Sequence, residues 1–189
     1  NGLPDDEGDI ILTSVNSTVT GGNLTAAGTS DITGNGVFFD TIIAGNDSNI
    51  ISTGDIIGVL EEAGDTIRNI AGFGEGNTGI LDVQTMRARN IELQATDTLD
   101  VGVLEVGENL ILRADIINAP SVTQVPSGPL PLNVTLTGPN GVVATKATIN
   151  VDAPAGIVMP DLQVSETLMT TTADYVEIQN AYTPIQGTS

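Results

Sequence analysis

The chain has 189 residues, enough for one domain, and combines 24 Asp and Glu with only 5 Lys and Arg, for a net charge of −19. This balance excludes a surface that binds nucleic-acid phosphates, while the lack of His and Cys excludes His/Cys zinc sites, Ser-His-Asp and Cys-His catalysis and disulfides. Hydrophobic residues make up 40% of the chain but aromatics only 3%, which favours strands and turns over disorder.

Residues 1–118 predict a series of short strands. Apolar and polar residues alternate in runs such as Asp9–Thr13, Asn90–Gln94 and Asn109–Arg113, and each run stops at Gly, Asn or Asp. The best helix candidate is Val59–Arg68, although Gly64 interrupts it. No uncharged apolar run reaches the roughly 18 residues of a membrane helix, so we expect no membrane insertion.

The strands recur with a period close to that of a solenoid coil. An Asp or Asn followed by an aliphatic residue returns every 17 to 24 residues, at Asp9, Asp31, Asn49, Asn69, Asn90, Asn109, Asn133 and Asn150. A repeat of about 20 residues fits one coil of a parallel β-helix, in which like side chains stack about 4.8 Å apart. The fold class that we predict is all-β, a right-handed parallel β-helix of about nine coils, roughly 40–45 Å long.

A proline-rich segment divides the chain. Residues 119–131 hold four of the nine prolines, and proline removes donors from a ladder, so we expect a loop or linker that leaves the stack. Residues 132–189 then predict a hairpin-bearing or irregular β section that continues the stack. The hairpin would turn at Gly138–Gly141, where Asn-Gly is a strong turn signal. A β-sandwich in residues 132–189 is the alternative.

Few residues are candidates for chemistry, and we expect no catalytic, cofactor-binding or metal-binding residue. Four glycosylation sequons begin at Asn16, Asn23, Asn46 and Asn133. Arg87 and Arg89 share one face of a strand, where they either pair with acidic neighbours or mark a small anion site.

Calcium is the one candidate ion. Its ligands would be hard oxygens from the acidic run Asp5–Asp9, or from a flank of stacked coils. The flank consists of Asp97, Asp100, Glu105 and Glu108. Neither set carries a known calcium-loop pattern, so a solvated acidic surface is the competing interpretation.

Two segments resemble the filamentous-haemagglutinin-like large secreted proteins of bacteria, which leave the cell by two-partner secretion. Residues 90–112 are similar to the rungs of such shafts, with aliphatic alternation, a Val-Gly turn and the phrase Asn-Leu-Ile-Leu. Residues 152–165 and 170–182 are similar to a section of the very long members. The secretion-signal domain of the family is not recognisable, which predicts a shaft or later portion of a longer protein.

The resemblance implies an extracellular location at the cell surface. It also implies an outer-membrane transporter as a partner during export, and an adhesin that meets a host or cell-surface ligand or associates with itself. We therefore expect a structural or adhesive β-helical segment of a surface protein or extracellular fibre, without catalysis. The alternatives are a self-assembling extracellular filament subunit and a polysaccharide-active β-helix enzyme, which would use paired carboxylates.

Overall fold

The computed structural model describes residues 8–126 and 129–182, and this part of the chain is all-β. Every pairing among its 15 strands is parallel, as predicted from the sequence. The only helical element in these residues is a short 3-10 turn, Pro139–Gly141, and no helix in them could span a membrane.

The strands are short except for two. Their bounds are β1 (Ile10–Thr13), β2 (Val19–Ala26), β3 (Ser30–Gly34), β4 (Val37–Ala44), β5 (Ser48–Ser52), β6 (Ile56–Ala63), β7 (Thr66–Ala71), β8 (Leu81–Ala95), β9 (Thr98–Arg113), β10 (Ile116–Gln124), β11 (Leu132–Thr137), β12 (Ala144–Asp152), β13 (Ile157–Leu162), β14 (Val164–Thr172) and β15 (Val176–Ile178). The predicted helix Val59–Arg68 is wrong, because β6 and β7 occupy these residues. Pairing with neighbouring coils on both sides outweighs the weak helical pattern.

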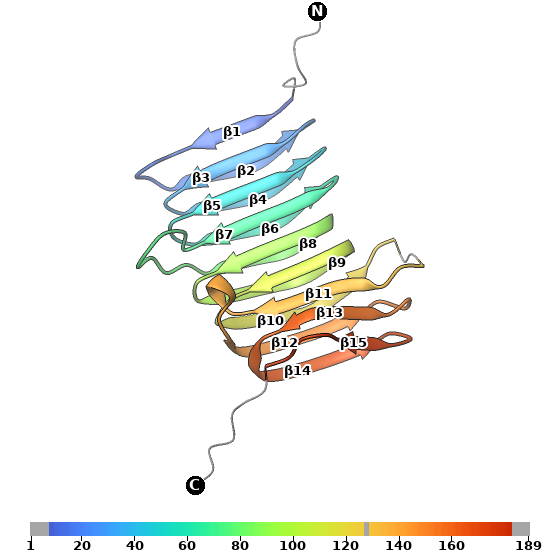
Figure 1. Ribbon diagram of the computed structural model, residues 1–189. Helices are drawn as coiled ribbons and strands as arrows, with labels where there is room; N and C mark the ends of the chain where they lie inside the picture. Colours follow the sequence, from blue (N-terminus) through green and yellow to red (C-terminus); the bar gives the residue numbers. More distant parts are fainter. Residues whose placement is uncertain (1–7, 127–128, 183–189) are drawn as a thin grey trace, which may run out of the picture.

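The strands form two ladders that the chain visits alternately (Figure 1). The first ladder contains β1, β3, β5, β7, the second halves of β8 and β9, then β11, β13 and β15. The second contains β2, β4, β6, the first halves of β8 and β9, then β10, β12 and β14. Inward side chains from both ladders form one hydrophobic core. The arrangement is consistent with a β-helix or solenoid.

Side chains of one kind stack in columns along the core. One column in the second ladder pairs Val37, Ile56, Leu81, Leu99 and Ile117 in successive coils, each at most 1% exposed. Stacked aliphatic side chains of similar size leave no gap between coils, so each coil buries the apolar surface of the one before it. The scarcity of aromatics follows from this packing.

Phe39 is the aromatic exception in the core, and a glycine pairs with it in each neighbouring coil. Gly21 pairs with Phe39 in the preceding coil and Gly58 in the following coil. A Cβ atom at Gly58 would lie 2.2 Å from the Phe39 Cζ atom, far inside van der Waals contact. The ring therefore occupies the space that a side chain at position 58 would need, whereas a Cβ atom at Gly21 would meet Leu24, 3.3 Å away.

The Asp and Asn residues that recur about every 20 residues predict the register between coils only in part. Asp31 pairs with Asn49, and Asn90, Asn109 and Asn133 pair in successive coils, as predicted. The predicted stacking of Asn69 between Asn49 and Asn90 is wrong. Asn69 is buried and pairs with Ile50 and Leu93. The predicted pairings at the two ends of the series, at Asp9 and at Asn150, are wrong as well. Asp31 pairs with Ile11 rather than Asp9, and Asn150 lies in the second ladder, opposite Thr170.

The C-terminal third continues both ladders, so the predicted hairpin and the alternative sandwich are wrong. β11 and β12 do not pair with each other: β11 pairs with β9 and β13, and β12 with β10 and β14. The turn at Asn140, with φ of 56°, instead carries the chain from one ladder to the other. The stack also extends beyond residue 118, since β10 includes Pro120. This proline is tolerated because pairing with β12 shifts register between Ala119 and Val122.

Replacing Gly58 by alanine tests the fit around Phe39. We expect Gly58→Ala to lower the free energy of unfolding by about 2 kcal/mol, because the new methyl group overpacks the core against the ring. Phe39→Leu removes the ring atoms that clash. In that background Gly58→Ala should therefore lower the free energy of unfolding far less than it does in the parent chain. Urea unfolding of the single and double variants measures the coupling.

Gly22→Ala is the matched control, since its added Cβ would meet only Asp40 Oδ2 at 3.8 Å. Its free energy of unfolding should stay within about 0.5 kcal/mol of the parent. Equal losses for Gly58→Ala with and without Phe39 would contradict this packing.

Candidate functional site

Every basic residue of the chain pairs with a carboxylate on a different strand. The five are Arg68, Arg87, Arg89, Arg113 and Lys146. Arg87 is the most completely engaged, with Nη1 2.7 Å from Glu62 Oε1 in the preceding coil and Nε bonded to Glu105 Oε2 in the following one. The hydrogen bond and charge of Glu105 raise the pKa of Arg87, and the same hydrogen bond lowers the pKa of Glu105. The pairing alternative for Arg87 is confirmed.

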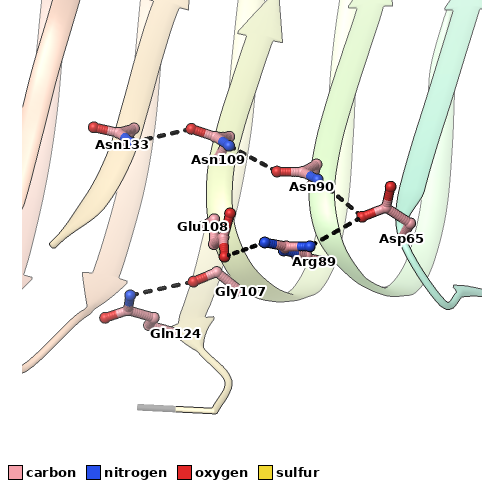
Figure 2. Close-up of polar contacts among 8 residues, drawn as sticks. All are labelled: Asp65, Arg89, Asn90, Gly107, Glu108, Asn109, Gln124 and Asn133. Atoms are coloured by element: carbon pink, nitrogen blue, oxygen red, sulfur yellow. Dashed lines mark hydrogen bonds and ion pairs between the residues drawn. The ribbon is translucent and has the colours of Figure 1, made fainter. Parts of the chain in front are cut away.

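Arg89 makes a second bridge across three coils. Its Nη2 lies 2.8 Å from Glu108 Oε1, and its Nη1 lies 3.9 Å from Asp65 Oδ1 (Figure 2). The hydrogen bond that Arg89 donates to Glu108 is the main cause of the raised pKa of Arg89. The interpretation that Arg89 pairs with acidic neighbours is therefore confirmed, and both strand-face arginines connect coils.

A chain of side-chain amides runs beside this bridge, along the start of the first ladder. Asn133 Nδ2 donates to Asn109 Oδ1 at 3.0 Å, and Asn109 Nδ2 donates to Asn90 Oδ1 at 2.7 Å (Figure 2). Asn90 Nδ2 completes the series with a 3.3 Å bond to Asp65 Oδ1. All donors point toward the N-terminal coils and the series ends on a carboxylate, so the bonds polarise one another in the same sense. The four coils are joined by side chains as well as by backbone.

One ionisable group lies wholly inside the core. Glu61 is 0% exposed and stacks between Ile42 and Met86 in the second ladder. Ser48 Oγ donates to its Oε1 and Asn69 Nδ2 contacts its Oε2, both at 2.6 Å and both from the first ladder. Burial raises the pKa of Glu61 to about 7, against the lowering effect of the two hydrogen bonds.

The sequence did not reveal this polar cluster, because its three members are far apart in the chain and two lie in aliphatic columns. Glu61 belonged to the helix candidate, where it would have faced solvent. In β6 two consecutive residues, Val59 and Leu60, point away from the core, and this bend turns Glu61 inward. Only the register, which sets Glu61 against Ile42 and Met86, could have identified it.

A groove of about 510 Å³ lies beside the proline-rich segment. Its walls include Ala63, Ala88, Arg89 and Pro126. Gln124, almost fully buried, donates its Nε2 to the carbonyl oxygens of Gly107 at 3.2 Å and Leu130 at 3.0 Å. This amide therefore ties the segment after β10 back to the stack, and the groove is the space between the two.

The predicted glycosylation sites all lie on the surface. Asn16, Asn23, Asn46 and Asn133 are exposed, and their modification stays a prediction. Asn133 differs from the others because its amide nitrogen already donates to Asn109, so a glycan there would compete with the amide series.

The candidate calcium ligands are not gathered into one site. Asp5, Asp6 and Glu7 lie outside the described residues, and Asp9 Oδ1 accepts the backbone N–H of Thr29 at 2.6 Å. The flank residues have separate partners: Asp97 accepts from Thr98, Asp100 from Asn118, Glu105 from Arg87, and Glu108 pairs with Arg89. Within residues 8–126 and 129–182, no three acidic side chains are grouped so that they could hold a metal ion.

No protein-family model, curated protein or solved structure matches the chain. The similarity to filamentous-haemagglutinin-like proteins therefore rests on residues 90–112, 152–165 and 170–182 alone, and stays a prediction.

The buried carboxyl makes stability depend on pH. Because the pKa of Glu61 is about 7 in the folded chain and about 4.5 when unfolded, only the folded chain holds the proton between these values. The free energy of unfolding should therefore fall as pH rises from 4.5 to 7, by about 3 kcal/mol in total, and this contribution should stay constant outside the window.

Urea unfolding across pH 4 to 9 of the parent and Glu61→Gln measures this effect. The variant keeps the shape of the side chain without its charge, and the other carboxyls titrate alike in both chains. The difference between the two curves should change only between pH 4.5 and 7. Parallel curves over the whole range would show that Glu61 ionises freely in the fold.

Proposed function

We propose that the chain is a right-handed parallel β-helix and serves as a structural or adhesive segment of a secreted bacterial surface protein or extracellular fibre. The observation that carries this proposal is the unbroken pair of parallel ladders, reinforced by side chains that bridge coils. Parallel strands joined by crossovers are right-handed in almost all proteins, which supports the handedness. The similarity of residues 90–112 to the rungs of secreted shafts supports the location.

Closure of the coil is supported by the long strands. In β8, the consecutive residues Gln84 and Thr85 both lie outside the core. Arg89 and Asn90 repeat this pattern five residues later. A strand alternates sides at every residue, so two successive outward residues mark a bend. Two bends within β8 would turn one strand around the core and give each coil three sides.

The function would be mechanical. A pull or bend on the stack is opposed by every backbone hydrogen bond of the ladders, and also by the Arg87, Arg89 and asparagine bridges between coils. The carboxylates that pair with none of the five basic residues repel like surfaces, which would keep a long β surface soluble. Export through an outer-membrane transporter and contact with a cell-surface ligand belong to this proposal through the family resemblance.

Spin labels on one column test whether the chain acts as a rigid spacer. Thr25 and Thr172 end an outward column of the second ladder, seven coil steps apart. The chain has no cysteine, so Thr25→Cys/Thr172→Cys can be labelled selectively. Dipolar electron resonance should give one narrow distance near 34 Å, equal to seven spacings of about 4.8 Å.

The pair Ile43→Cys/Thr172→Cys, one step shorter, is the control and should reduce the distance by about 4.8 Å. Neither distance should change between 0.05 and 1 M salt. A broad or salt-dependent distribution would argue against a rigid spacer.

A self-assembling filament subunit is the second candidate, and the two ends of the stack favour it. Among the described residues, β1 pairs only with β3 and β15 only with β13, so each end of the first ladder has an open edge. Val176 and Ile178 continue buried columns above Ile157 and Met159, yet are 40% and 46% exposed. The edges run in the same direction, so a second copy could extend the ladder head to tail.

Sedimentation velocity over a range of concentrations tests assembly. We expect polymers of the parent chain that shorten with Ile178→Lys, because a charge at the C-terminal edge cannot be buried under a second copy. Val142→Lys, at a 58% exposed position in the turn before β12, should leave assembly unchanged. A parent chain that stays monomeric at every concentration would exclude this candidate.

A further inference from the structure

A second groove, of about 450 Å³, crosses the outer surface of the second ladder from β2 to the start of β8. Exposed Gly22 lies in its lining and contributes no side chain to fill it. The groove spans three coil spacings, or about 14 Å. This is the length of about four residues of extended chain.

The groove presents apolar side chains to solvent. Phe38 lies half-buried along it, while Ile57 and Val59 are 39% and 45% exposed. Phe38 and Ile57 pair in register, so they form a continuous apolar strip along the axis. A planar ring next to branched aliphatic side chains suits the apolar and cationic side chains of a peptide.

Two carboxylates flank this strip without a cation. Asp40 and Asp82 are exposed, and all five basic residues pair with other acidic residues. Asp82 pairs in register with Asp100, which has an amide partner in Asn118 at 2.8 Å. Stacked like charges destabilise a ladder, so a positive charge beside Asp82 would be favourable.

We propose that this groove binds an extended basic peptide segment of another protein. Lys or Arg side chains of the segment pair with Asp40 and Asp82, and its apolar side chains cover Phe38 and Ile57. The charge of the groove selects a cationic occupant over acidic glycans and nucleic acids, which the same carboxylates repel. The proposal stands whether the chain is a shaft, a filament subunit or neither.

Calorimetry with a synthetic peptide, acetyl-Arg-Val-Arg-Val-Arg-amide, tests the proposal on the full chain. We expect Asp40→Asn/Asp82→Asn to weaken binding by at least about tenfold at 50 mM salt. Gly22→Val should weaken it similarly without changing charge, because the new side chain enters the groove. The nearest groove atom to a Cβ at Gly22 is 3.8 Å away, so this variant should keep its fold, which circular dichroism checks.

The control variant Asp152→Asn/Asp174→Asn removes the same charge from exposed positions outside the groove and should change affinity less than about twofold. The same peptide with citrulline in place of arginine should not bind. Three results would overturn the proposal: an equal loss of affinity in the control variant, equal binding of the citrulline peptide, or no binding by the parent chain. Equal binding of a glucosamine oligomer would also overturn it, and would assign the groove to amino sugars.

Discussion

The register between coils is the constraint on which the rest of the structure depends. Because all the strands of each ladder run in parallel, the paired residues of successive coils lie directly over one another, and each side chain must suit the ones above and below it. The aliphatic columns, the amide series from Asn133 to Asp65 and the bridges at Arg87 and Arg89 all follow from this one condition. A shift of one residue would turn each of these contacts to the wrong side of the sheet.

The parts of the fold that repeat could be predicted from the sequence. Short alternating runs at intervals of about 20 residues indicated parallel coils, and the Asn90, Asn109 and Asn133 markers gave their register correctly. The prediction failed where the chain departs from its own pattern. Asn69 carries the marker residue type but points inward, and the Gly138–Gly141 signal turns the chain between ladders instead of within one sheet.

The polar contacts also divide into those that could be predicted from the sequence and those that could not. Pairing of Arg87 and Arg89 could be inferred from composition, because so many carboxylates surround so few cations. The buried cluster around Glu61 and the groove beside Phe38 could not be inferred in this way. Each joins residues from several coils whose alignment depends on bends inside the strands. A bend adds one outward residue, and this single residue decides whether a carboxylate meets water or the core.

The glycines around Phe39 bear on how the length of such a stack can vary during evolution. Coils such as those of β8 and β9 place aliphatic residues over aliphatic residues, so one of them could be duplicated or deleted and its neighbours would still fit. The coil that contains Phe39 differs, because its ring fits against the following coil only where Gly58 pairs with it. A tandem duplication of that coil alone would set one phenyl ring on another in a space sized for one. Gain and loss of coils should therefore be confined to the aliphatic part of the chain, and the N-terminal coils should be inherited as a block.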